Sequence, residues 1–180
     1  MNKLAARIFA LILASGLSCS DEPIEIDLYA LTLEGSGAKI GTIRARDTPA
    51  GTEFSPNLSG LSPGFHGFHL HTAPDCGPAE KDGKSVPGLA AKGHFDPADT
   101  GLHAGPNGNG HLGDIPALKA DQDGKVVEAV VAPRLKSSDL KGHALIVHGG
   151  GDNYSDSPEK LGGGGPRIAC GVIPLSPEPD

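Results

Sequence analysis

Histidines with a spacing suited to metal binding stand near the middle of this sequence. His69 and His71 are separated by one residue in the segment GFHGFHLH, residues 64–71. Successive side chains of a β-strand point to opposite faces, so both imidazoles are expected on one face, with Phe68 on the other. Two imidazoles on one face of a rigid strand form a pair of metal ligands. His66 shares the parity of Phe68 and is expected to bond backbone groups beside the core.

The segment HALIVH, residues 143–148, contains a further candidate ligand. Its two histidines are five residues apart, so a regular strand places them on opposite faces. His148 ends the segment beside a glycine-rich stretch, which suits a ligand. His143, at the start of the segment, is expected to be structural.

A third group of histidines lies in a long stretch rich in glycine and proline. The segments GHFDP, GLHAGP and GHLGD supply three imidazoles and a carboxylate, a donor set that zinc accepts in a closed tetrahedral site. Such a loop has little to hold its shape without a metal, so a metal is expected to order it. A scatter of solvated histidines is the alternative, but all eight histidines of the chain fall between positions 66 and 148. The candidate ligands of this group are His94, His103, His111 and Asp114.

The elements that must position these residues are predicted to be short β-strands. Apolar and polar residues alternate in several segments, and no window shows sustained helical periodicity. Together with 27 glycines and 16 prolines, this pattern indicates an all-β fold, a sandwich or a flattened Greek-key barrel. Long irregular stretches at about residues 72–115 and 149–166 are expected to be functional loops. Strands are predicted within residues 24–33, 39–46, 51–64, 65–71, 125–135, 143–148 and 167–175, the first two joined by a turn at GSG.

The first 20 residues have the pattern of a secretory signal peptide. Lys3 and Arg7 are followed by an apolar run and then by small residues, and the run is too short to span a membrane. A buried N-terminal strand or helix is one alternative, and a lipoprotein anchored through Cys19 is another. The remaining residues, 21–180, are predicted to form one domain.

Charge and cysteine content follow from the expected export. Removal of Lys3 and Arg7 changes the formal net charge from −7 to −9, so neither nucleic acid nor an anionic membrane is an expected partner. Outside the cytoplasm, Cys76 and Cys170 are expected to form a disulfide, and a pair of free buried thiols is the alternative.

Five motifs in one order resemble the copper-zinc superoxide dismutases, specifically the bacterial secreted kind. They are GFHLH, GHFDP, GHLGD, ALIVHGGGDNYSD and GGGGPRIACGVI, and the similarity extends over residues 24–175. This family is a standard example of β-sandwich architecture, and the resemblance implies an eight-stranded Greek-key barrel. It also implies dismutation of superoxide to oxygen and hydrogen peroxide by a copper redox cycle, with zinc as a structural and tuning ion. The enzyme would protect the cell envelope from the periplasm.

The resemblance assigns the metal ligands residue by residue. His94 would bridge the two metals and carry a proton during catalysis. Asp152 would hydrogen-bond ligands of both metals, which fixes the orientation of their rings. Copper is expected on His69, His71, His94 and His148, and zinc on His94, His103, His111 and Asp114.

Other residues receive roles from the same resemblance. Arg167, beside the copper, would attract and hold the superoxide anion. Cys76 and Cys170 match the family's intrachain disulfide. Lys81 and Lys84 resemble a basic subloop that steers the substrate.

Two other functions use the same fold. A metal buffer or copper-delivery module would be expected to lack copper ligands or the arginine, and a copper-only enzyme would lack the zinc ligands. This sequence has all of them. Both a monomer and a homodimer are compatible with the sequence.

Overall fold

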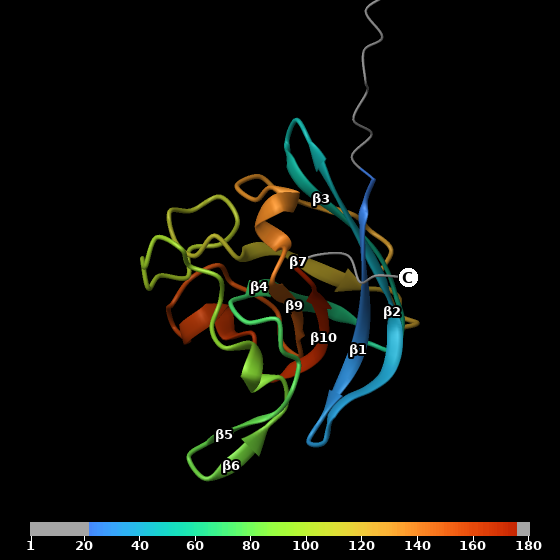
Figure 1. The fold of residues 1–180 in the computed structure, drawn as a ribbon, viewed down its shortest axis with the longest axis vertical. Helices are drawn as coiled ribbons and strands as arrows, with labels where there is room; N and C mark the ends of the chain where they lie inside the picture. Colours follow the sequence, from blue (N-terminus) through green and yellow to red (C-terminus); the bar gives the residue numbers. More distant parts are fainter. Residues whose placement is uncertain (1–21, 176–180) are drawn as a thin grey trace, which may run out of the picture.

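Eight antiparallel strands build the fold (Figure 1). The structure is a computed structural model that describes residues 22–175, so the predicted signal peptide and Cys19 lie outside the described residues. The strands form one sheet in the order β7-β4-β9-β10-β1-β2-β3-β8, a nearly closed barrel, which confirms the predicted fold class. Their bounds are β1 (Ile24–Thr32), β2 (Gly35–Thr48), β3 (Gly51–Leu58), β4 (Gly64–His71), β7 (Asp114–Ala120), β8 (Val130–Ala132), β9 (His143–His148) and β10 (Arg167–Ile173).

Two long segments leave the barrel, as predicted. The first joins β4 to β7 and contains a hairpin of β5 (Ala79–Lys81) and β6 (Lys84–Val86), followed by the 3₁₀ turn η1 (Leu89–Ala91). In Figure 1 this hairpin projects away from the barrel. The second segment joins β9 to β10 and contains η3 (Lys160–Gly163). A further 3₁₀ turn, η2 (Ser137–Leu140), precedes β9. Within residues 22–175, no helix has the length and hydropathy needed to cross a bilayer.

The two faces of β4 differ as its alternation predicts. Phe68 and Leu70 are fully buried in the hydrophobic core of the barrel, where the Phe68 ring packs edge-on against Phe54 with 5.5 Å between centroids. His69 and His71 lie on the other face, beneath the two long segments. Burial of the aromatic and aliphatic residues therefore fixes the direction in which both imidazoles point.

Several details of the strand prediction are wrong, among them the hairpin of β5 and β6, which lies in a stretch expected to be irregular. Strand β7 was not predicted, because Pro116 interrupts its pattern; the structure accommodates this proline where the β4–β7 register shifts. The predicted strand at 125–135 is reduced to β8, which ends before Pro133. The turn between β1 and β2 lies at Leu33 and Glu34, and the segment GSG is already part of β2.

Candidate metal centre

Six buried imidazole nitrogens in the described part of the chain make no well-formed hydrogen bond, although His103 Nδ1 and His111 Nδ1 lie 3.0 Å and 3.4 Å from Asp114 Oδ1. A buried polar atom without a partner costs about 1–3 kcal/mol, so such atoms are rare unless something else satisfies them. All six belong to residues that the sequence predicts to be metal ligands, and they lie together beside β4. The atoms are His69 Nδ1, His71 Nε2, His94 Nε2, His103 Nδ1, His111 Nδ1 and His148 Nε2.

Four histidines converge in one group, named here the four-histidine cluster: His69, His71, His94 and His148. Each offers a ligand atom within 4.8 Å of the others. Two come from β4, and His148 ends the neighbouring strand β9. The backbone of His94 reaches the group through an isolated bridge to His71, which joins the first long segment to the end of β4.

A second group, named here the mixed cluster, contains His94, His103, His111 and Asp114. Asp114 begins β7 and pairs in register with His69, so a strand contact brings the two groups together. Ligand atoms of His69, His94, His103 and Asp114 all lie within 4.8 Å of one another. His111 lies just beside them, with its Nδ1 3.4 Å from Asp114 Oδ1. His94 belongs to both clusters, and its ring stacks on His69 with 3.9 Å between centroids.

The second nitrogen of most of these rings is held by the protein. Asp152 accepts from His69 Nε2 at Oδ2 and from His103 Nε2 at Oδ1, both at 2.8 Å, so one carboxylate orients a ring in each cluster. His71 Nδ1 donates to the Lys92 carbonyl and His148 Nδ1 to the Gly165 carbonyl. Rings oriented in this way present one lone pair in a fixed direction, which is the arrangement of imidazoles that ligate a metal.

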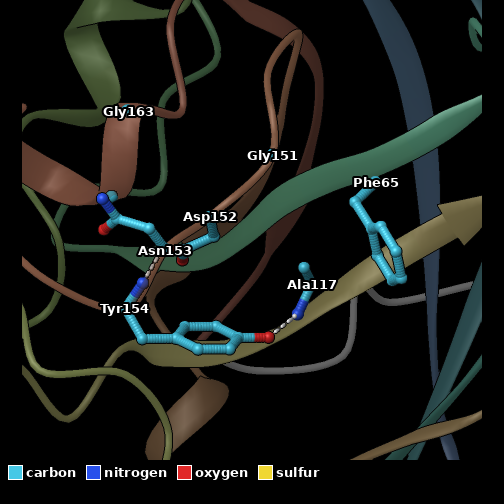
Figure 2. A pocket seen from close by; sticks show the side chains of 8 residues that line it. Phe65, Ala117, Gly151, Asp152, Asn153, Tyr154 and Gly163 are labelled. Carbon is cyan, nitrogen blue, oxygen red and sulfur yellow. Dashed lines mark hydrogen bonds between the residues drawn. The ribbon is translucent and has the colours of Figure 1, made fainter.

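The position of Asp152 depends on the second long segment around it. The Tyr154 backbone N–H donates to Asp152 Oδ1 at 2.7 Å, and the Tyr154 hydroxyl accepts a hydrogen bond from the Ala117 N–H on β7 (Figure 2). Gly162 packs directly against the carboxylate: a Cβ at this position would lie 1.9 Å from Asp152 Oδ1, and φ is +69°. Glycine is therefore required at this position.

Electrostatics differ between the two clusters. Burial, with a smaller contribution from neighbouring imidazoles, lowers the pKa of His69 to about 3 and that of His148 to about 4. Burial also acts against a charge on His103, but the carboxylates of Asp114 and Asp152 outweigh it and raise the pKa of His103 to about 9. In the metal-free protein at neutral pH, the four-histidine cluster is consequently neutral at His69 and His148, whereas the mixed cluster holds a proton on His103.

We expect metal binding to the two clusters to respond differently to pH. A metal must displace the proton of His103, so affinity at the mixed cluster should rise with pH until about pH 9. Affinity at the four-histidine cluster should stay nearly constant down to about pH 5, because His69 and His148 remain neutral. Calorimetry of Zn²⁺ and Cu²⁺ binding in buffers of different ionisation enthalpy measures the protons released. Equal proton release by both metals at pH 7 would contradict this prediction.

Arg167 lies at the edge of the four-histidine cluster. It begins β10 and pairs in register with His148 on β9. Its guanidinium donates to the carbonyls of Gly88 and Lys92, which fixes it against the first long segment. Its positive charge contributes to the low pKa values of His71 and His148, although burial is the larger cause for both.

The predicted disulfide is present in the structure. Cys76, on the first long segment, is bonded to Cys170 on β10, with 5.8 Å between their Cα atoms. The bond therefore joins the segment that carries Gly88 and Lys92 to the strand that begins with Arg167. Lys81 and Lys84 face each other across the exposed β5–β6 hairpin, outside both clusters.

Two histidines lie outside the clusters, as expected. His66 is buried and hydrogen-bonded at both nitrogens, to the carbonyls of His148 and Ser62. His143 bonds the Thr72 carbonyl and packs on the ring of Phe95. Both nitrogens of His66 and Nδ1 of His143 are therefore used in structural contacts away from the two clusters.

Three residues that hold the site were missed by the sequence analysis. Arg134, which follows β8, donates to the carbonyls of Gly105, Pro106, Gly110 and His111, so it clamps the segment that carries His111. Asp156 accepts from the backbone N–H groups of His103 and Leu161 and joins the two long segments. The Lys92 carbonyl binds both His71 and Arg167. Contacts to backbone groups far away in the chain leave no pattern in the sequence.

Comparisons with known proteins agree with this geometry. A family model described as copper/zinc superoxide dismutase matches residues 39–173. The superoxide dismutase [Cu-Zn] of Escherichia coli K12 is 52% identical over 174 residues, covering 96% of this chain and 99% of the relative. The Cu/Zn superoxide dismutase structure from Brucella abortus is 54% identical with a TM-score of 0.83, over 84% of this chain and 99% of that one. The solution structure of the monomeric enzyme from Salmonella enterica is 51% identical with a TM-score of 0.75 and the same coverages. The clustered imidazoles, the fold and these matches agree: the chain belongs to the copper/zinc superoxide dismutase family.

Proposed function

We propose that this chain dismutates superoxide in the periplasm, using a copper ion at the four-histidine cluster and a zinc ion at the mixed cluster. The observation that carries the proposal is the convergence, within residues 22–175, of six buried imidazole nitrogens without a well-formed hydrogen bond. Copper, when bound, supplies the one-electron chemistry that oxidises one superoxide to oxygen and reduces another to hydrogen peroxide. His69 is proposed as a copper ligand. His111 is proposed as a zinc ligand, because its Nδ1 lies beside Asp114, the carboxylate of the mixed cluster.

The zinc ion has a structural role in this proposal. His103, His111 and Asp114 come from a segment with little regular secondary structure, and zinc in a closed site with imidazole and carboxylate ligands would order it. Zinc has no redox chemistry at this site. It would also fix the His94 ring, which the two clusters share.

Arg167 is proposed to hold the substrate. Superoxide is a small anion, and a guanidinium beside the copper site offers a positive charge with N–H donors. The carbonyls of Gly88 and Lys92 restrict the guanidinium to one orientation, so little freedom is lost when the anion binds.

His94 is proposed to move a proton. Its Nδ1 lies 2.9 Å from Asp114 Oδ1 in the mixed cluster, and its orphaned Nε2 faces the four-histidine cluster. Nε2 can therefore take up a proton while the ring stays held at Nδ1, and can return that proton as peroxide forms.

Periplasmic location is proposed from the leader-like residues 1–20 and from the disulfide. Cys76–Cys170 is a bond that persists in oxidising compartments. In that compartment the enzyme would protect the cell envelope from superoxide.

The test is metal analysis of the purified chain combined with a superoxide-decay assay of the wild type and Arg167→Ala. We expect about one copper and one zinc per chain in both proteins, and a rate constant about 10- to 100-fold lower in the variant. Arg44→Ala is the matched control, because Arg44 is an exposed arginine on β2 that pairs with Glu25 away from the clusters.

Each other outcome of this experiment has a definite meaning. Metal binding without turnover would indicate a metal buffer instead of an enzyme. Full turnover of a zinc-free protein would indicate a copper-only enzyme. An Arg167→Ala variant as fast as wild type would remove Arg167 from the mechanism.

Lys81 and Lys84 are proposed to steer superoxide from the β5–β6 hairpin. The chain is acidic overall, so exposed cations on the first long segment would offset its long-range repulsion of an anion. Replacing both lysines by glutamine should slow dismutation at low ionic strength and matter less at high ionic strength, because salt screens exposed charges. Equal rates of variant and wild type at low ionic strength would refute this role.

A further inference from the structure

Lys92 has a backbone conformation that is unusual for a lysine. Its φ is 64° and its ψ is −150°. This combination lies close to a region that is essentially restricted to glycine, because a Cβ crowds the backbone there. A glycine at position 92 would adopt the conformation without strain. Strained residues of this kind persist at functional sites. The presence of a lysine instead of a glycine at position 92 therefore suggests that its side chain has a function.

The backbone of Lys92 has a clear role, but that role does not require lysine. Its carbonyl oxygen accepts a hydrogen bond from His71 Nδ1 at 2.9 Å and another from Arg167 Nη2. One peptide group therefore positions a ring of the four-histidine cluster and the proposed substrate-binding arginine. Glycine would place the same carbonyl in the same position at lower conformational cost, so the contacts of the carbonyl leave the side chain unexplained.

The side chain of Lys92 is an exposed cation at the edge of the site. Within residues 22–175 its ammonium forms no ion pair and donates no side-chain hydrogen bond to another residue. It belongs to the residue whose carbonyl accepts a hydrogen bond from Arg167, so the backbone that carries the side chain is in direct contact with the guanidinium. The hairpin lysines, in contrast, project away from the barrel with β5 and β6 (Figure 1).

We infer that Lys92 is a further substrate-attracting residue, whose unpaired ammonium concentrates superoxide at Arg167. A cation beside the binding position raises the local concentration of an anion, and the effect is large where the rest of the chain carries net negative charge. Superoxide dismutases are a standard example of enzymes at the diffusion limit, where such steering is visible in the rate. The inference rests on the proposed role of Arg167 as the site that receives the anion.

The test compares four variants of the copper- and zinc-loaded protein over a range of ionic strength. Lys92→Gln removes the charge and keeps the strain, Lys92→Gly removes both, and Lys92→Arg keeps both. Lys125→Gln is the matched control, because Lys125 is an exposed lysine in the turn after β7, at the opposite end of the β4–β7 pair from His69. The rate constant for superoxide decay and the dissociation constant of azide, an anionic probe, are measured for each. The thermal midpoint of each metal-free protein separates strain from charge.

We expect Lys92→Gln and Lys92→Gly to lose about two- to fourfold in rate at low ionic strength and to converge with wild type at high ionic strength. Azide should bind both variants more weakly by a similar factor, and Lys92→Arg should restore the rate and the azide affinity. Lys92→Gly should melt at a higher temperature than Lys92→Gln, because it relieves the strain. The Lys125 control should follow the wild type.

Two results would overturn the inference. One is a Lys92→Gln variant whose rate, salt dependence and azide affinity equal those of wild type. The other is a loss in Lys92→Gln that Lys92→Gly does not share, because both variants lack the charge and the loss would then have another cause. Failure of the proposed function is distinguishable from both, because it would appear as metal binding without superoxide decay in the wild type, and failure of the role of Arg167 would appear as an unchanged rate in Arg167→Ala.

Discussion

Replacing Asp152 by alanine is expected to weaken metal binding at both clusters at once, by about 10- to 100-fold in each. The reason is the position of a single carboxylate between His69 Nε2 and His103 Nε2, each 2.8 Å from one of its oxygens. Without it, both rings lose the acceptor that sets their orientation, and each must be ordered by the metal itself. The buried N–H groups would also be left without a partner.

The measurement is competition with chelators of known affinity, performed separately for Zn²⁺ and Cu²⁺. Asp96→Asn is the control, because Asp96 lies in the first long segment and, within residues 22–175, its carboxylate accepts hydrogen bonds only from Thr100 and Gly101. Asp152→Asn should fall between alanine and wild type, since an amide has one acceptor oxygen for two donors. A loss confined to one metal in Asp152→Ala would show that the carboxylate does not connect the two clusters.

Removing the disulfide is expected to cost about 4–5 kcal/mol in the free energy of unfolding. Cys76 and Cys170 are 94 residues apart in the chain, and the entropy of closing a loop of that size in the unfolded state gives this magnitude. The bond also anchors the segment that holds Arg167, so a folded variant should lose activity as well. In that variant the carbonyls of Gly88 and Lys92 would no longer be fixed relative to β10.

Urea unfolding of the metal-free proteins measures this cost, with Cys76→Ala/Cys170→Ala compared with oxidised and reduced wild type. Metal-free samples are required because bound metals stabilise the folded state and would mask the difference. The reduced wild type should resemble the double variant, which separates the covalent bond from the packing of the side chains. A difference below about 1 kcal/mol between the oxidised wild type and the double variant would contradict the chain-entropy argument.

The strands that carry the first ligands could be predicted because their physics is local. The alternation of β4 places Phe68 in the core and His69 on the opposite face, and the structure has both residues there. Strand β7 could not be predicted, since Pro116 breaks the pattern and only pairing with β4 makes a strand of that segment. The segment at 125–135 shows the reverse error. Its apolar residues favour a strand, but only a small part of it pairs with a neighbouring strand.

The sequence by itself determined the types of ligand, the all-β class and the two cysteines able to pair. The ligand types follow from the chemistry of individual residues, and the strands follow from an alternation of apolar and polar residues with a period of two. Both are local properties of the sequence. The tertiary structure decided how the site is supported: Asp152 between two rings, Arg134 across the second ligand segment, and the strained Lys92 peptide beneath Arg167. These contacts join residues that are dozens of positions apart, often through backbone groups that every residue has, so only the folded chain defines them.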